Sequence, residues 1–276
     1  MAQDCAVWVY AVAGRIEDDW LDAVPGVDGA PVRAVAAAGL AAAMTSVSLD
    51  EFGEGPLRRH LEDLSWLDTT ARAHHRVIEI IARHGSVVPM RLATIFHDDS
   101  SVADMLTQRR DRFTAVLHQV AGRVEWGVKV YAAGQDSVPA RPVAARAGDA
   151  QHAAPGATAS PGAAYLRRRR AALSATQDNR RAAQASADAV HAALGSLATA
   201  AQLRPPQAPQ LSGEAARMML NAAYLVAQDR SPEFAAAADR LAGQHPAVRL
   251  ELTGPWPPYS FAAVDLGEAA RDRTPT

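Results

Sequence analysis

The chain has 276 residues with a net charge of −2, and 49% of them are hydrophobic and 21% charged; this balance is typical of a globular protein and excludes wholesale disorder. A nearly neutral chain has no general attraction for nucleic acid or for an anionic membrane, and we expect neither as a partner. The single cysteine, Cys5, excludes an internal disulfide and a cysteine-built metal site. With no evident signal peptide or membrane-spanning run, the sequence predicts a soluble, cytoplasmic protein.

Strand patterns dominate the first fifty residues. Ala6–Val12 carries β-branched and aromatic side chains on both faces, which predicts a central strand. Two further strands are predicted at Val32–Ala37 and Leu40–Val47, on either side of Gly39.

Helices and strands alternate in the residues that follow. Apolar residues recur at helical spacing from Leu67 to Ile81, and the predicted helix ends near Gly85. Val87–Phe96 reads as extended, with Pro89 restricting it to an edge, a bulge or a strand start. A capping box at Ser101–Asp104 predicts a second helix that continues to Val120, and Val124–Tyr131 alternates as a strand. Residues 1–133 are therefore predicted to form one α+β domain.

The second half of the chain has a different composition. Residues 134–162 consist mainly of Ala, Pro, Gly and Ser, and we interpret them as a flexible linker. Residues 163–265 are predicted to form a second α+β domain, with a long Ala-rich helix at about 165–201 and strands at 218–226 and 248–252. Ser231-Pro232-Glu233 begins another helix, and residues 266–276 are expected to be a frayed tail.

No established catalytic or cofactor-binding motif is present. The sequence contains no phosphate-binding glycine loop, no nucleophile elbow and no H-E-x-x-H motif. His74, His75 and Glu79 share one predicted helix, but His74 lies on its apolar stripe and His75 about 100° around the helix from it. We therefore interpret His74 as a core residue and His75–Glu79 as a solvated pair, and we predict no catalytic residue, cofactor or metal.

Two further groups of residues allow two interpretations each. The run Arg167–Arg170 is either a patch for an anion, a nucleic acid or an acidic partner, or a solvated helix start, since consecutive helical residues point in different directions. The aromatic residues of two predicted strands either line an exposed sheet face or pack beneath helices or against the second domain; they are Trp8, Tyr10, Trp126 and Tyr131.

Several segments, taken in chain order, resemble the gas vesicle protein F/L family. They cover nearly the whole chain, from about residue 6 to residue 264, and E-W-G-V-K-V-Y at 125–131 and G-P-W-P-P-Y-S-F at 254–261 are together highly specific. The other segments are V-W-V-Y at 7–10, L-E-D-L-S-W-L at 61–67 with A-R-A-H at 71–74, V-P-M-R-L-A-T-I-F at 88–96, Y-L-R-R-R at 165–169 and L-N-A-A-Y-L-V at 220–226.

The resemblance implies a non-enzymatic accessory protein of gas vesicle formation, which acts with the hydrophobic shell subunit and with other accessory proteins, as a minor vesicle component or an assembly factor. It also implies two α+β domains, the first a ferredoxin-like α/β sandwich. The sequence departs from the family in two places: Ala93 stands where members usually carry glycine, and the linker is unusually long.

Aromatic and basic residues are the candidates for contact with the shell subunit, because exposed aromatic turns and sheet edges can mask its hydrophobic surface. Three prolines in Gly254–Tyr259 stiffen that turn, so Trp256 is predicted to be either a binding anchor or part of the core. The rival hypothesis is an enzyme or a small-molecule-binding module that uses Arg91, His74 and His75. The partner-binding candidates are Trp8, Tyr10, Trp126, Tyr131, Arg167, Arg168, Arg169, Arg170, Trp256 and Tyr259.

Overall fold

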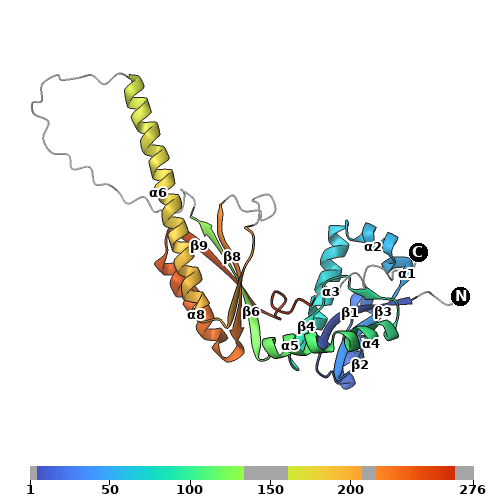
Figure 1. The fold of residues 1–276 in the computed structure, drawn as a ribbon. Helices are drawn as coiled ribbons and strands as arrows, with labels where there is room; N and C mark the ends of the chain where they lie inside the picture. Colours follow the sequence, from blue (N-terminus) through green and yellow to red (C-terminus); the bar gives the residue numbers. More distant parts are fainter. Residues whose placement is uncertain (1–4, 134–160, 207–215, 265–276) are drawn as a thin grey trace, which may run out of the picture. The chain divides into compact units, whose positions relative to one another are not determined.

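A computed structural model describes residues 5–133, 161–206 and 216–264. The described chain is an α+β structure with a five-stranded and a four-stranded sheet (Figure 1). It divides into two compact units, each of which is discontinuous in sequence. Unit 1 takes in the described residues of 1–126, 225–231 and 254–276, and unit 2 takes in those of 127–224 and 232–253.

The sheet of unit 1 is built around its first strand. The strands are β1 (Cys5–Ala13), β2 (Arg33–Ala37), β3 (Leu40–Ser48), β4 (Val87–Pro89) and β5 (Ile95–Phe96). Their order is β2-β3-β1-β4, with β5 also paired to β1, and the pairs β1–β3, β1–β4, β1–β5 and β2–β3 are antiparallel. The predicted central strand and the two strands after it are confirmed, and Pro89 ends its short strand, as its missing N–H requires.

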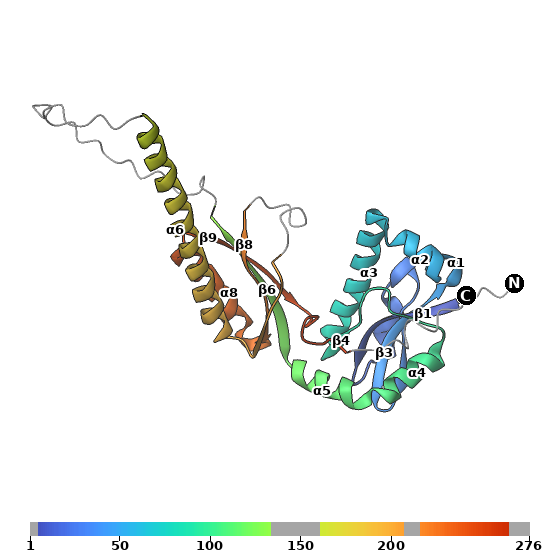
Figure 2. The same ribbon diagram turned by 45° about the horizontal axis from the view of Figure 1, so that its top comes forward.

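Helices cover both faces of this sheet (Figure 2). They are α1 (Leu49–Phe52), α2 (Glu54–His60), α3 (Leu64–Ala82), α4 (Asp99–Gln108) and α5 (Arg110–Val120), with short 3₁₀ turns η1 (Asp18–Ala23) and η2 (Val27–Gly29). Helix α3 packs on β1 and β4 over Trp8 and Tyr10, while α4 and α5 contact β2, β3 and β4. Because side chains alternate along β1, the strand contributes side chains to the apolar layer on each face of the sheet.

Two helix boundaries differ from the prediction. The second predicted helix starts earlier, since Asp98 is its N-cap: its Oδ1 accepts a hydrogen bond from the Ser101 backbone N–H at 2.8 Å. That helix also breaks at Arg109, whose φ of −114° and ψ of 16° separate α4 from α5. The helices α1 and α2 were not predicted, because their short apolar pattern is below the length at which periodicity is informative.

Unit 2 contains most of the second sheet and two helices. The elements that lie wholly or mostly in it are β6 (Arg123–Ala132), α6 (Pro161–Gly195), β7 (Ala200–Leu203), β8 (Met218–Ala227), α8 (Ser231–Gln244) and β9 (Val248–Trp256), with strand order β7-β8-β6-β9. The turn η4 (Gln228–Arg230) belongs to unit 1. Tyr224 of β8 joins both helices to the sheet: its hydroxyl lies 2.7 Å from Nδ1 of His191 in α6, and its ring lies 5.4 Å from that of Phe234 in α8.

The long helix is confirmed, but its predicted end was wrong. It stops at Gly195, and the residues from Ala200 form β7 instead of a further turn of helix. The predicted linker at 134–162 lies outside the described residues except for Pro161 and Gly162, which belong to α6, and the predicted tail at 266–276 lies outside them entirely. The compact units also differ from two consecutive domains, because residues 254–264 group with unit 1.

Candidate partner-binding site

Two of the predicted contact residues are core residues. Trp8 and Tyr10 are both 0% exposed, so neither can contact a partner without opening the core of unit 1. The Tyr10 hydroxyl accepts a hydrogen bond from the Val27 backbone N–H at 2.8 Å. The prediction of an exposed aromatic face on this strand was therefore wrong, and its alternative, packing beneath a helix, is what the structure shows. The physical reason is that α3 brings its own apolar stripe onto this face of β1.

Burial also explains the chemistry of His74. Trp8 Nε1 donates to His74 Nδ1 at 2.9 Å, which fixes the proton on Nε2, 3.1 Å from the carbonyl oxygen of Met90. Burial lowers the pKa of His74 to about 4 because the charged imidazolium would be desolvated. His74 is thus a neutral, satisfied core histidine, as the sequence indicated, and its ring nitrogens are already engaged.

The aromatic residues of β6 are buried as well. Trp126 is 8% exposed and its Nε1 donates to the Ser231 hydroxyl at 2.9 Å. Tyr131 is 2% exposed, and the Arg249 guanidinium lies 4.6 Å from the centre of its ring. Neither is placed to contact a partner directly, which corrects the prediction for both. The alternating pattern of β6 could not reveal this, because side chains on both of its faces are covered.

The end of β9 lies against the beginning of β6. Glu125, 5% exposed, accepts a hydrogen bond from the Ser260 backbone N–H at 2.7 Å and a second, short one from the Ser260 hydroxyl. Gly254 has a φ of +125°, and a Cβ there would lie 2.8 Å from the Glu125 carbonyl oxygen. Only glycine fits this backbone position. The two motifs at 125–131 and 254–261 therefore meet at Glu125, a residue that sequence reasoning quoted but did not select.

Helix α3 supplies the other support of the turn. The Tyr259 hydroxyl lies 2.7 Å from Nδ1 of His75, and Nε2 of the same ring lies 3.4 Å from the Glu79 carboxylate, close enough for an ion pair but not aligned as a hydrogen bond. Burial, and then the negative charges of Glu79 and Glu125, raise the pKa of Tyr259, so it stays a neutral phenol. His75 also meets Trp256 edge-on, with ring centres 5.4 Å apart.

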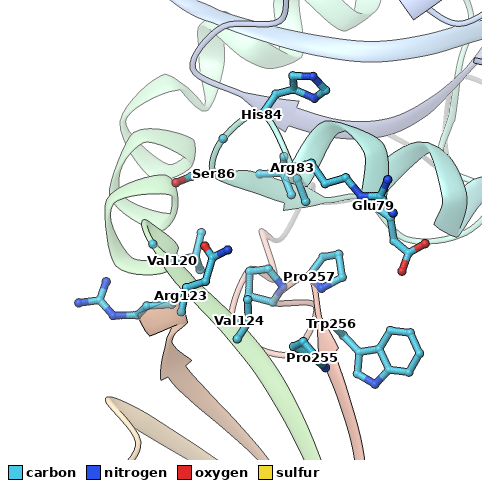
Figure 3. A pocket seen from close by; sticks show the side chains of 16 residues that line it. Glu79, Arg83, His84, Ser86, Val120, Arg123, Val124, Pro255, Trp256 and Pro257 are labelled. Carbon is cyan, nitrogen blue, oxygen red and sulfur yellow. The ribbon is translucent and has the colours of Figure 1, made fainter. Parts of the chain in front are cut away.

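Trp256 itself is open to solvent. It is 39% exposed, whereas Pro257 and Pro258 beside it are buried. The prolines and Trp256 line a groove of about 530 Å³ together with Val124 of β6 and with residues of α3 and the segment after it (Figure 3). The apolar lining residues include Pro255, Trp256, Pro257, Val124 and Val87, and the polar ones include Glu79, Arg83, His84, Arg123 and Gln228. We call this feature the proline–tryptophan groove.

The remaining predicted residues do not join it. Arg167, Arg169 and Arg170 lie on exposed positions of α6, and Arg91 is exposed on the segment between β4 and β5, whereas the ring of His74 is buried. Within the described part of the chain, no group of His, Cys, Asp and Glu residues could hold a metal ion. Among these same residues, no helix has the length and apolarity needed to cross a membrane.

Comparison with known proteins identifies the family of the chain. Residues 6–263 match the family described as gas vesicle synthesis protein GvpL/GvpF. The chain belongs to this family. It is 40% identical over 264 residues to gas vesicle protein L of Streptomyces sp. (strain CB03234), covering 96% of this chain and 95% of that protein. Gas vesicle protein F of the same strain is 27% identical over 263 residues, covering 93% of this chain and 99% of the relative.

Solved structures show the same fold at low sequence identity. The crystal structure of GvpF from Anabaena sp. PCC7120 matches with a TM-score of 0.66 at 15% identity, over 95% of this chain and 97% of that one. GvpF from Microcystis aeruginosa matches with a TM-score of 0.64 at 18% identity, over 94% and 99%. As a GvpL/GvpF protein, this chain thus combines the family's α+β fold with a groove lined by Pro255–Pro258 of its motif at 254–261.

Proposed function

We propose that this GvpL/GvpF protein is a non-enzymatic accessory factor that binds the hydrophobic gas vesicle shell subunit and other accessory proteins during vesicle assembly in the cytoplasm. Membership of a family of gas vesicle synthesis proteins supports the vesicle role. The observation that supports binding is the proline–tryptophan groove, which holds a partly exposed tryptophan on a stiff, well-anchored turn. The alternative of an enzyme built on Arg91, His74 and His75 has no support in this geometry.

The groove has the properties of a preorganised anchor. Buried Pro257 and Pro258 limit the backbone, and Glu125 and His75 hold Ser260 and Tyr259 on either side of them. Little conformational entropy is then lost when Trp256 enters an apolar pocket of a partner. Tryptophan in such a setting is a frequent hot spot of protein–protein interfaces. Trp256 is therefore the proposed contact residue, and Tyr259 positions the turn that carries it.

We also propose the domain arrangement that the family resemblance implies. The order β4-β1-β3-β2 with antiparallel neighbours is the strand order of a ferredoxin-like sheet, and α3 takes the place of its second helix. The 3₁₀ turns η1 and η2 stand where the first helix would be. The proposed arrangement is an N-terminal ferredoxin-like domain and a C-terminal α+β domain joined by a linker, with residues 254–264 returning to the N-terminal unit. The 40% identity to protein L against 27% to protein F of one Streptomyces strain favours the L-type paralogue.

A pull-down with the shell subunit tests the binding proposal. The tagged chain and the shell subunit are co-expressed, and capture is compared among the wild-type protein, Trp256→Ala and Leu203→Ala. Leu203 is an exposed apolar residue of unit 2, at 66% exposure, and serves as the matched control. We expect Trp256→Ala to lose about 2 kcal/mol or more of affinity and the control to bind normally. Equal capture of all three proteins would refute the role of the groove.

Deletion of the gene in its native host tests the vesicle role itself. We expect gas vesicles to be absent or deformed, without a metabolic defect, because the protein is proposed to assemble and not to catalyse. A strain that lacks this protein and its paralogues but still forms normal buoyant vesicles would contradict the proposal.

A further inference from the structure

The first half of α6 has no neighbours among the described residues. From Tyr165 to Ala182, every side chain that the structure describes is exposed, and burial begins at Ala183. Both ribbon views show this part of the helix continuing past α8 and the strands of its own unit (Figures 1 and 2). A helix gains most of its stability from packing an apolar face, so an exposed stretch of five turns calls for an explanation. We call residues 165–182 the free half of α6.

Two leucines of the free half lie near the line of the apolar stripe of the packed half, beyond Arg180. Ala183, Ala187, Val190 and Leu194 are buried at spacings of four, three and four residues. Seven-residue steps backward from Ala187 reach Arg180, Leu173 and Leu166, and a helix face turns by only about 20° per seven residues. Leu166 and Leu173 are 60% and 63% exposed, and Tyr165 beside them is 56% exposed. Leu166 and Leu173 thus lie near the line of an existing packing face, and no described residue covers them.

The free half is also strongly basic. It holds six arginines and a single acidic residue, Asp178, which gives +5, whereas the whole chain carries −2, so the rest of the chain carries −7. Asp178 pairs with Arg181 at 3.5 Å. Arginines at 167, 169 and 170 are exposed on the turns of Leu166 and Leu173, and Arg180 is exposed two turns further along the helix. An apolar seam flanked by arginines complements a helix with an apolar seam flanked by carboxylates.

We propose that the free half of α6 is a docking helix for an acidic amphipathic helix of a partner protein. A second copy of the same helix is disfavoured, because pairing would bring two +5 segments together. Nucleic acid would meet the arginines but leave Leu166 and Leu173 exposed to water. Residues 134–160 of the chain itself contain two arginines and two aspartates, and Val138 and Val143 are their largest aliphatic residues, so they lack both the charge and the bulk to serve. The proposal is independent of shell-subunit binding at the groove, since α6 and the groove belong to different units.

Binding of designed peptides to the full-length chain tests the proposal. The probe is a labelled three-heptad peptide helix with leucine at its a and d positions and glutamate at e and g; the comparison peptide carries lysine at e and g. Fluorescence anisotropy is measured with the wild-type chain and with two double variants, Leu166→Ser/Leu173→Ser and Arg169→Glu/Arg170→Glu. Matched controls change exposed residues elsewhere: Leu64→Ser/Leu203→Ser and Arg76→Glu/Arg112→Glu.

We expect the acidic peptide to bind and the lysine peptide not to bind. Each α6 double variant should weaken binding by roughly tenfold or more, and both control variants should bind as wild type does. Circular dichroism and melting temperature check that all variants fold, which substitution of exposed residues permits. The proposal is overturned if the acidic peptide does not bind, if the controls weaken binding as much, if a double-stranded RNA of matched length binds more tightly than the peptide, or if the free half instead mediates self-association that Leu166→Ser/Leu173→Ser abolishes.

Discussion

The buried carboxylate of Glu125 accepts hydrogen bonds from the backbone N–H and the hydroxyl of Ser260, which lies 135 residues further along the chain. The pairing joins the start of β6 to the turn after β9, and so fixes the position from which Trp256 reaches solvent. Charge-assisted hydrogen bonds to a buried carboxylate are stronger than neutral ones, and leaving their partners unsatisfied is costly.

This relationship predicts a measurable coupling between the two residues. Glu125→Ala should lower the free energy of unfolding by about 2–3 kcal/mol, since a buried backbone donor loses its acceptor. Each single substitution also removes other interactions of these residues, so the double-mutant cycle with Ser260→Ala is the informative measurement. Denaturant unfolding of the four proteins should give a coupling energy of about 1–2 kcal/mol. Strict additivity of the two single effects would show that the hydroxyl contributes nothing to holding the turn.

The neutral state of His74 predicts a pH dependence of stability. Its pKa is about 4 in the folded protein, below the value of about 6.5 in an unfolded chain. Between these values the unfolded state binds more protons, so the free energy of unfolding falls as the pH is lowered from about 6.5 to 4, by up to about 1.4 kcal/mol per pH unit.

The His74→Gln variant isolates this contribution. Glutamine does not titrate, yet it can accept from Trp8 and donate to Met90. We expect urea unfolding of the variant between pH 7 and pH 4 to show a shallower loss of stability than the wild type. Parallel curves for the two proteins would mean that His74 does not carry the acid sensitivity.

Ala93 predicts a stabilising substitution. It has a φ of +61°, a left-handed conformation that disfavours side chains with a Cβ by about 1–2 kcal/mol. Ala93→Gly relieves this strain, while glycine's larger unfolded-state entropy offsets part of the gain, so stability should rise by up to about 1 kcal/mol. Ala103→Gly, inside α4, is the control and should lower stability by about 1 kcal/mol. A melting temperature that falls for both variants would contradict the strain.

The sequence predicted most of the elements because their patterns are strong. Alternating strands such as 124–131 and the helical stripe from Leu67 to Ile81 appear where expected, within a few residues. The predicted helix boundaries were wrong where a single residue starts or interrupts the helix. Asp98 caps α4 although Ser101 starts a capping box, and the backbone at Arg109 separates α4 from α5 although the apolar stripe continues on both sides of it. Periodicity describes which face is apolar, but it does not fix where the backbone leaves the helix.

The candidate site was predictable only in part, for a related reason. Aromatic residues of β1 and β6 gave the same sequence signal as Trp256, yet Trp8 and Tyr131 are buried and Trp256 is not. Which of them reaches solvent depends on helices that arrive from elsewhere in the chain. The contacts of Glu125 and His75 with the turn likewise join residues more than 130 positions apart. Motif matching brought both partners to attention but could not show that they meet.

Substitution of tryptophan by alanine is expected to lower stability strongly at Trp8 and only slightly at Trp256. Trp8 is completely buried and its Nε1 donates to Nδ1 of His74. Trp8→Ala should therefore lower the free energy of unfolding by about 3–5 kcal/mol, because it leaves a cavity and removes the hydrogen-bond donor of the His74 ring. Trp256 is 39% exposed and meets His75 only edge-on, so Trp256→Ala should lower stability by no more than about 1–2 kcal/mol. Thermal melts of both variants, run beside the shell-subunit pull-down, separate the two roles. If Trp256→Ala unfolds as readily as Trp8→Ala, the tryptophan is part of the core and the loss of capture would reflect unfolding. If it melts normally and loses capture, the ring is the anchor that its exposed position on a proline-stiffened turn indicates.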